Sequence, residues 1–383
     1  MMQTSAITVA AAGVACARRG VVVFRDAKSQ RAAHDHATCG AIARALAAIK
    51  GAPFAGEYDA GVDYGHIPYF VPTDTLVGVD DARALGIADE DDLFGGVVPH
   101  AFVATKCISH PLVDERACVP EGWSEAFGQR VRGAVLEGYA AFSTDDAMRA
   151  GVRLFVHGPV RIKRALGIGG YGQIVVSDER ALEQALADAD ADEVARFGIA
   201  LEQDLVDVTT HSVGQARVDD LVASYCGTQR LTRNNHGHQV YGGSDLLVAR
   251  GDYDALLALD HAPATRRAVL HARLYDEAAF DCYAGLFASR RNYDIAEGVD
   301  ASGVRRSGVL EQSWRVGGAS SAEIAALAAF RDDPSLAVVR ASSTEVYGAD
   351  VSPPAGSTVY FEGVDERAGP LTKYVQLSRD VHA

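Results

Sequence analysis

The stretch from Ser307 to Ile324, SGVLEQSWRVGGASSAEI, contains an alternating polar pattern that ends at two glycines. Glu311, Ser313 and Arg315 occupy every second position, and successive side chains of a strand point to opposite faces. In a strand, an acid, a hydroxyl and a guanidinium would therefore share one surface. The pattern predicts a β-strand that presents these polar groups together.

The residues after Arg315 predict the start of a helix. Gly317 and Gly318 interrupt the strand, and Ser320 and Glu323 have the spacing of a capping box, in which a serine caps the helix and an acid reaches back to it. Helix N-termini attract anions. We therefore expect an anion to bind between Arg315 and the first amides of this helix.

A second strand should precede the first one in a hairpin. Turn-forming residues at 300–303 predict a hairpin that places Asn292 opposite Glu311, with Asp294 on the same face opposite Val309. Side chains of neighbouring strands converge at such spacings, and carboxylate, amide and hydroxyl oxygens suit Mg²⁺. The alternative is a solvated polar face held by surface salt bridges. The predicted magnesium ligands are Asp294, Glu311, Ser313 and Asn292.

The stretch PVRIKRALGIGGYGQIVV, residues 159–176, predicts two strands joined by a glycine-rich loop. Val160 and Ile162 would face a core, while Arg161 and Lys163 face the other side. Glycine amides can close over phosphate oxygens because no Cβ obstructs them. The alternative is a plain flexible hairpin. The loop is neither a Walker loop, since it lacks GKS or GKT, nor a dinucleotide fingerprint, since a strand follows it.

Size and charge limit the classes of function. The chain has 383 residues, a formal charge of −15 and a pI near 5.2. This length predicts two or three domains, and the acidic balance argues against nucleic acid or an acidic membrane as partner. The six cysteines are scattered without a CxxC pair, which favours a reduced, cytoplasmic protein. The apolar run ITVAAAGVACA is too short to span a bilayer and is interpreted as a buried strand or helix.

The N-terminal part of the chain has an α/β pattern. Short apolar runs alternate with a helical segment in which Ile42, Leu46 and Ile49 lie on one face, and Gly51 is a suitable helix end.

Two polar clusters elsewhere suggest ligands but have simpler explanations. His34, His36 and Cys39 invite a zinc interpretation, but their spacing matches no standard zinc site, and a surface turn before the helix is preferred. Residues 234–245, NNHGHQVYGGSD, form either a ligand-binding loop or a long hairpin, and the hairpin is preferred.

In order, these segments resemble the ATP-grasp superfamily over residues 105–320. The resemblance implies an α/β fold that ends in a two-lobed ATP-grasp domain with antiparallel sheets. The chain looks most like a bacterial family at the edge of the superfamily. The implied segments are an N-terminal pre-ATP-grasp α/β domain at 1–104, the ATP-grasp domain at 105–330 with its glycine-flap lobe at about 150–200 and its metal-binding lobe at about 201–330, and C-terminal strands packed on it at 331–383.

The resemblance also implies roles for individual residues. VLEQSWRVGG is similar to the superfamily's ExNxR strand at Glu311 and Arg315, whereas Ser313 replaces the asparagine, and Asp294 matches the acid of the preceding strand. Arg315 and Lys163 would be the catalytic residues. The implied nucleotide contacts are Lys106 in ATKCISHPLVDERACVP, Lys163, the flap residues Gly167, Gly169, Gly170, Tyr171 and Gly172, and Glu202, Gln203 and Leu205 in GIALEQDLVD.

The implied reaction uses ATP and Mg²⁺ to phosphorylate a small-molecule carboxylate, whose acyl phosphate is then attacked by an amine or another nucleophile. The partners would be these two substrates, without nucleic acid or membrane, in a cytoplasmic protein that could form a homodimer. Two alternatives stay open. One is an ATP-grasp kinase or a biotin-carboxylase-like carboxylase, and the other is a degenerate nucleotide-binding or scaffold protein, which Ser313 suggests.

Overall fold

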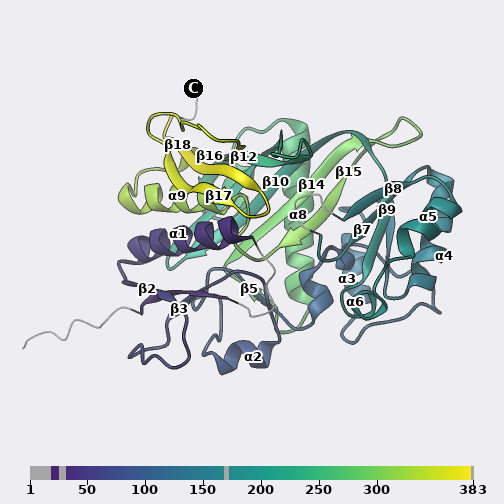
Figure 1. The fold of residues 1–383 in the computed structure, drawn as a ribbon, viewed down its shortest axis with the longest axis horizontal. Helices are drawn as coiled ribbons and strands as arrows, with labels where there is room; N and C mark the ends of the chain where they lie inside the picture. The colour runs from purple at the N-terminus through teal and green to yellow at the C-terminus, as the bar shows by residue number, and fades with distance from the viewer. Residues whose placement is uncertain (1–18, 26–31, 168–171, 381–383) are drawn as a thin grey trace, which may run out of the picture.

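The computed structural model describes residues 19–25, 32–167 and 172–380, where it combines a parallel sheet, a small mixed sheet and antiparallel sheets with helices (Figure 1). The predicted mixed α/β fold with antiparallel sheets is confirmed. Within the described ranges, no helix is both long and apolar enough to cross a membrane. Outside them lie the apolar run at residues 7–17 and the flap residues Gly169, Gly170 and Tyr171.

A three-stranded parallel sheet in the order β2–β1–β3 opens the described chain, with β1 at Val21–Phe24, β2 at Phe54–Glu57 and β3 at Tyr69–Pro72. Helix α1, Ala33–Lys50, connects β1 to β2 and ends at Gly51, which adopts a left-handed φ of 59° that suits glycine. The buried face of α1 includes the three predicted residues Ile42, Leu46 and Ile49.

Short elements connect this sheet to the rest of the chain. β5, at Gly96–Val98, pairs with β4 on one side and with the distant β13, Phe287–Ala288, on the other. Residues far apart in the sequence therefore share one small sheet. The other connecting elements are β4 (Leu76–Val77), α2 (Val79–Ala84), the 3-10 helices η1 (Ala101–Ala104) and η2 (Lys106–Ser109), and α3 (Glu125–Val131).

A four-stranded antiparallel sheet in the order β6–β9–β7–β8 forms a lobe with α4, α5 and α6, at the right of Figure 1. Val160 and Ile162 of β7 lie in its core, as their alternation predicts, and the glycine-rich segment joins β7 to β8. The elements are β6 (Gly138–Ala141), α4 (Thr144–Leu154), η3 (Phe155–His157), β7 (Val160–Arg164), β8 (Gln173–Val176), α5 (Glu179–Leu186), α6 (Ala191–Phe197) and β9 (Ile199–Gln203).

An eight-stranded antiparallel sheet forms the centre of the molecule, in the order β15–β14–β10–β11–β12–β16–β18–β17. Its last three strands come from the C-terminal segment, so they extend this sheet directly. The domain boundaries at residues 104, 200 and 330 stay predictions. The strands are β10 (Val206–Val218), β11 (Leu221–Arg233), β12 (Gln239–Arg250), β14 (Arg290–Val299), β15 (Arg305–Ser313), β16 (Val338–Tyr347), β17 (Thr358–Asp365) and β18 (Gly369–Ser378).

Helices cover both faces of the large sheet. α7 (Tyr253–Leu257) and α8 (Pro263–Cys282) pack on one face, while α1 and α9 (Ser320–Asp332) lie side by side on the other (Figure 1). Two adjacent residues of β11 show that the sheet separates two hydrophobic cores. Cys226 belongs to the core under α8, and Tyr225 belongs to the core under α1 and α9.

The hairpin of β14 and β15 has a different register from the one predicted. Asp294 pairs with Glu311 and Asn292 pairs with Ser313, two residues away from the prediction. One residue of this difference arises at the turn, where Val299 pairs with Arg305, and the other from a bulge at position 310. The bulge has a physical cause beyond the hairpin, since the amide of the adjacent Val309 donates to the carbonyl of residue 134 at 2.7 Å. The two carboxylates therefore lie directly opposite each other, and not diagonally.

Two other local predictions are wrong. Ala319 is the residue before α9, and Glu323 does not cap the helix but is buried in an ion pair with Arg290 at 2.7 Å. Helix α1 already contains residues 34–39, which were predicted as a surface turn. Residues 234–245, by contrast, belong to the β11–β12 hairpin, as the preferred interpretation states.

Lys373 on β18 fastens the C-terminal strands to α1. Its Nζ lies 3.0 Å from Asp35 Oδ1 and 3.1 Å from Glu345 Oε1, and 9% of the side chain is exposed. Lys373→Met would leave two largely covered acids without their cation, so we expect a loss of about 2–4 kcal/mol in the free energy of unfolding, measured in urea by circular dichroism. The control Arg273→Met breaks an exposed pair with Glu277 and should cost less than about 1 kcal/mol. Equal losses in the two variants would contradict this role.

Candidate nucleotide and metal site

Three parts of the chain meet at the end of β15, namely η2, the start of the flap segment and β15 itself. The Nζ of Lys106, the first residue of η2, lies 2.9 Å from Glu311 Oε2 and donates to the carbonyl of Gly167 at 2.9 Å. η2 starts here because the hydroxyl of Thr105 accepts the N–H of Cys107. One buried lysine thus links the start of the flap segment to the predicted metal strand.

The second predicted lysine is buried against an acid. Lys163 Nζ lies 2.5 Å from Glu202 Oε1, and His110 Nε2 lies 3.2 Å from Glu202 Oε2. Burial acts to raise the pKa of Glu202, but the charge of Lys163 and the His110 hydrogen bond outweigh it and hold the pKa at about 2. Burial lowers the pKa of Lys163 despite its partner. Sequence reasoning missed His110, because its partner Glu202 lies 92 residues away in the chain.

Two carboxylates face each other across β14 and β15. Burial and the charge of Glu311 raise the pKa of Asp294 to about 6, despite hydrogen bonds from Gln229 and Asn292. Burial also acts to raise the pKa of Glu311, but the Lys106 ammonium holds it below its ordinary value. The pair therefore carries a repulsion that a cation between the two groups would relieve.

The chemistry of these groups fits Mg²⁺, a hard ion that takes carboxylate oxygens and retains waters. Asp294 and Glu311 would hold it. In the described part of the chain, no three His, Cys, Asp or Glu side chains gather as a metal cluster, and this includes the zinc candidates His34, His36 and Cys39.

Asn292 and Ser313 are tied into a buried hydrogen-bond network. Asn292 Nδ2 donates to Asp294 Oδ1 at 2.9 Å, while its Oδ1 accepts hydrogen bonds from two hydroxyl groups at 2.8 Å, those of Ser212 and Tyr225. Ser313 Oγ instead accepts a hydrogen bond at 3.3 Å from a buried guanidinium at the start of β14. The two predicted ligands are therefore not equivalent.

Arg290 provides that guanidinium, which sequence reasoning also missed. It donates to both carboxylate oxygens of Glu323 and to the carbonyl oxygens of Ser313 and Arg315, at 3.2 and 2.6 Å. The predicted catalytic side chain of Arg315 is 23% exposed and lies near Asp74, with Nε 3.8 Å from Oδ1. Arg290 thus fixes the backbone at Ser313 and Arg315, and with it the position from which the Arg315 side chain extends.

The predicted adenine residues lie on the connection from the four-stranded to the eight-stranded sheet. Gln203 ends β9 and donates to Asp300 Oδ2 at 3.4 Å, and Leu205 packs in a small apolar cluster with Leu136 and Ala296. Glu202 points to Lys163, as described above. The described flap glycines are Gly167 and Gly172.

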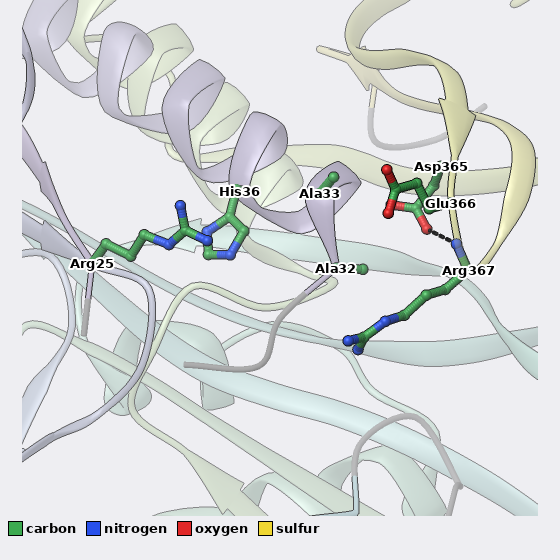
Figure 2. A pocket seen from close by; sticks show the side chains of 7 residues that line it. All are labelled: Arg25, Ala32, Ala33, His36, Asp365, Glu366 and Arg367. Atoms are coloured by element: carbon green, nitrogen blue, oxygen red, sulfur yellow. Dashed lines mark hydrogen bonds between the residues drawn. The ribbon is translucent and has the colours of Figure 1, made fainter. Parts of the chain in front are cut away.

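A separate cavity of about 310 Å³ lies at the start of α1 (Figure 2), and it is lined by His36 but by none of the predicted nucleotide or magnesium residues. Asp365, the last residue of β17, accepts the backbone N–H groups of His34, Arg367 and Ala368. This carboxylate caps α1 from another element, so Asp365 has a structural role.

Two solved structures of low sequence identity share this fold at a TM-score of 0.50. A carboxyaminoimidazole ribonucleotide synthase from Aspergillus clavatus, solved with ATP, matches with a TM-score of 0.50 at 11% identity over 95% of each chain. The N5-carboxyaminoimidazole synthase of that organism, solved with ADP and 5-aminoimidazole ribonucleotide, also gives 0.50, at 12% identity over 95% of each chain. A biotin carboxylase from Campylobacter jejuni gives 0.48 at 13% identity, over 94% of this chain and 87% of the other.

Sequence comparison identifies the family of the chain but not its activity. No curated protein sequence matches the chain. A family model described as "Protein of unknown function (DUF3182)" matches residues 22–375, which is most of the chain. The protein therefore has the ATP-grasp fold, as the sequence predicts, and belongs to the DUF3182 family.

Proposed function

We propose that this protein uses ATP and Mg²⁺ to activate a small-molecule carboxylate as an acyl phosphate, which an amine or another nucleophile then attacks. One observation carries the proposal: Asp294 and Glu311 face each other in register, and Lys106 contacts both Glu311 and the flap segment. Paired acids beside lysines suit a cation and a polyphosphate bound together.

Lys106 and Lys163 would contact the nucleotide phosphates. Both ammonium groups are buried against carboxylates, so their positions are set before the nucleotide binds. Glu202 would orient Lys163, and the flap glycines would offer backbone N–H groups to the phosphates. Gln203 and Leu205 would contact adenine and ribose on the connection between the sheets.

Asp294 and Glu311 would hold Mg²⁺, which when bound offsets negative charge on the transferring phosphoryl group. A carboxylate oxygen of the substrate attacks the γ-phosphorus and ADP leaves. The nucleophile then adds to the acyl carbon, phosphate leaves, and the nucleophile loses a proton. Arg315 would hold the substrate carboxylate and the acyl phosphate, because its planar guanidinium pairs with both groups.

Ser313 favours a second function. Its hydroxyl is held by Arg290 in the position where the ExNxR pattern has an amide, which suits a nucleotide-binding or scaffold protein without turnover. A kinase or a carboxylase would share the nucleotide site but differ in the acceptor. ADP formation that requires both a carboxylate and an amine identifies the ligase, whereas no turnover across metabolite pools identifies the scaffold.

Nucleotide binding gives the first test. ATP with Mg²⁺ at about 100 times its Kd should raise the free energy of unfolding by about 2.7 kcal/mol, measured by thermal unfolding. Lys163→Met and Glu311→Gln should lose most of this increase, because each removes a group that contacts the nucleotide or its cation. Lys50→Met is the matched control, since Lys50 pairs with Asp219 and should keep the full increase. The proposal fails if the wild-type protein gains nothing from ATP.

The raised pKa of Asp294 gives the second test. A folded pKa of about 6 is above the unfolded value, so ionisation of Asp294 removes stability as the pH rises through 6. Without metal, Asp294→Asn should therefore be more stable than wild type by about 2–3 kcal/mol at pH 8, and the gain should vanish near pH 4. Urea unfolding in EDTA measures both values.

An exposed aspartate controls this experiment. Asp254→Asn changes a surface carboxylate that pairs with Arg273, and it should alter stability little at either pH. If Asp294→Asn were destabilising by the same amount at pH 4 and pH 8, the two acids would not repel each other as described.

Arg315 separates binding from turnover. Once an acceptor is found, Arg315→Ala should lower kcat by roughly 100-fold or more, because the guanidinium acts on the acceptor. The Kd for ATP should change little. Arg331→Ala, which removes a surface partner of Asp220, should leave both values near wild type. A large loss of ATP affinity in Arg315→Ala, with kcat intact, would assign this arginine to the nucleotide.

A further inference from the structure

Four residues form one row across neighbouring strands. Tyr225 of β11 pairs with Gly214 of β10, which pairs with Asn292 of β14, and Asn292 pairs with Ser313 of β15. Position 214 must lack a side chain, because a Cβ there would lie 2.4 Å from the Tyr225 hydroxyl. The tyrosine therefore reaches across β10 and places its hydroxyl 2.8 Å from the amide group of Asn292.

The Tyr225 hydroxyl has one proton to donate, but two acceptor oxygens lie within hydrogen-bond distance of it. Glu323 Oε1 lies 2.6 Å away, and the Asn292 Oδ1 lies 2.8 Å away. A charged carboxylate forms the shorter and stronger hydrogen bond. The Tyr225 hydroxyl therefore donates its proton to the hydrogen bond with Glu323. The tyrosine oxygen then has only lone pairs for Asn292, and the group that suits lone pairs is the NH₂ of the amide.

The other neighbours of Asn292 permit this arrangement. Ser212 lies 2.8 Å from the same end of the amide and can accept a hydrogen bond as well as donate one. Amide oxygen and nitrogen are nearly isosteric, so exchanging them leaves every position unchanged. The exchange brings the amide oxygen to the atom that lies 2.9 Å from Asp294 Oδ1. Two oxygens at that separation repel each other unless a cation lies beside them or Asp294 is protonated.

We propose that Asn292 presents its amide oxygen to the cation held by Asp294 and Glu311, and that Tyr225 acts as the positioning residue that fixes this orientation. Asn292 then supplies, from the opposite strand, the amide oxygen that the ExNxR pattern has at position 313. The inference rests on the proposed function, and it explains how a site with Ser313 keeps a third oxygen ligand.

Binding of Mn²⁺, measured by electron paramagnetic resonance with and without a non-hydrolysable ATP analogue, tests the proposal. Tyr225→Phe should weaken Mn²⁺ binding roughly 10-fold, because the amide loses the acceptor that orients it, and Asn292→Leu should weaken it roughly 10- to 100-fold. Circular dichroism and unfolding in EDTA show whether each variant is folded. Tyr253→Phe is the matched control, since this buried tyrosine has a hydroxyl without a hydrogen-bond partner among the described residues.

The outcomes separate this inference from the proposed function. If the wild-type protein binds neither Mn²⁺ nor the nucleotide analogue, the proposed function fails and the inference fails with it. If wild type binds both, but Tyr225→Phe and Asn292→Leu bind Mn²⁺ as tightly or more tightly, only the amide orientation is overturned, because an NH₂ group facing the cation would oppose binding. Weaker binding in both folded variants, with Tyr253→Phe unchanged, supports the inference.

Discussion

The buried ion pair between Arg290 and Glu323 is the constraint on which the site depends. Each of the three guanidinium nitrogens of Arg290 has an acceptor, either on Glu323 or on the backbone of Ser313 and Arg315. The pair therefore fixes the end of β15 against the start of α9. Because an unpaired buried charge is costly, neither element can shift without a large loss of stability, and the groups on β15 keep their positions.

Charge at the site is closely balanced within an acidic chain. Lys163 is paired with Glu202 and Lys106 with Glu311, which leaves Asp294 as an additional acid. A bare anion would meet lysines that already have partners. Under the proposed function, a ligand that brings its own divalent cation would satisfy Asp294 and the lysines together, which would favour a metal–nucleotide complex over free phosphate.

Short-range geometry explains which features could be predicted from the sequence. Side-chain direction in a strand depends on the local backbone, so alternation was enough to place Glu311 on the same face as its polar neighbours. The bulge at Leu310 was not predictable, because it follows from packing against segments distant in the sequence. The same reason applies to Glu323, which matches a capping pattern but pairs with Arg290, and to His110, whose partner lies on β9. Sequence thus predicted the fold class and the common face of Glu311 and Ser313, whereas Arg315 lies beyond the end of β15 and long-range contacts set the register and the supporting network.

The order of strands in the large sheet also has a consequence for how the chain folds. β12 ends at Arg250, but its outer neighbour β16 begins at Val338. During synthesis from the N-terminus, the outer edge of β12 therefore has no strand to pair with until β16 has emerged. Closing so long a connection is entropically costly and slow. Exposed strand edges promote aggregation, and the pairing with β16 removes this edge of β12 from solvent.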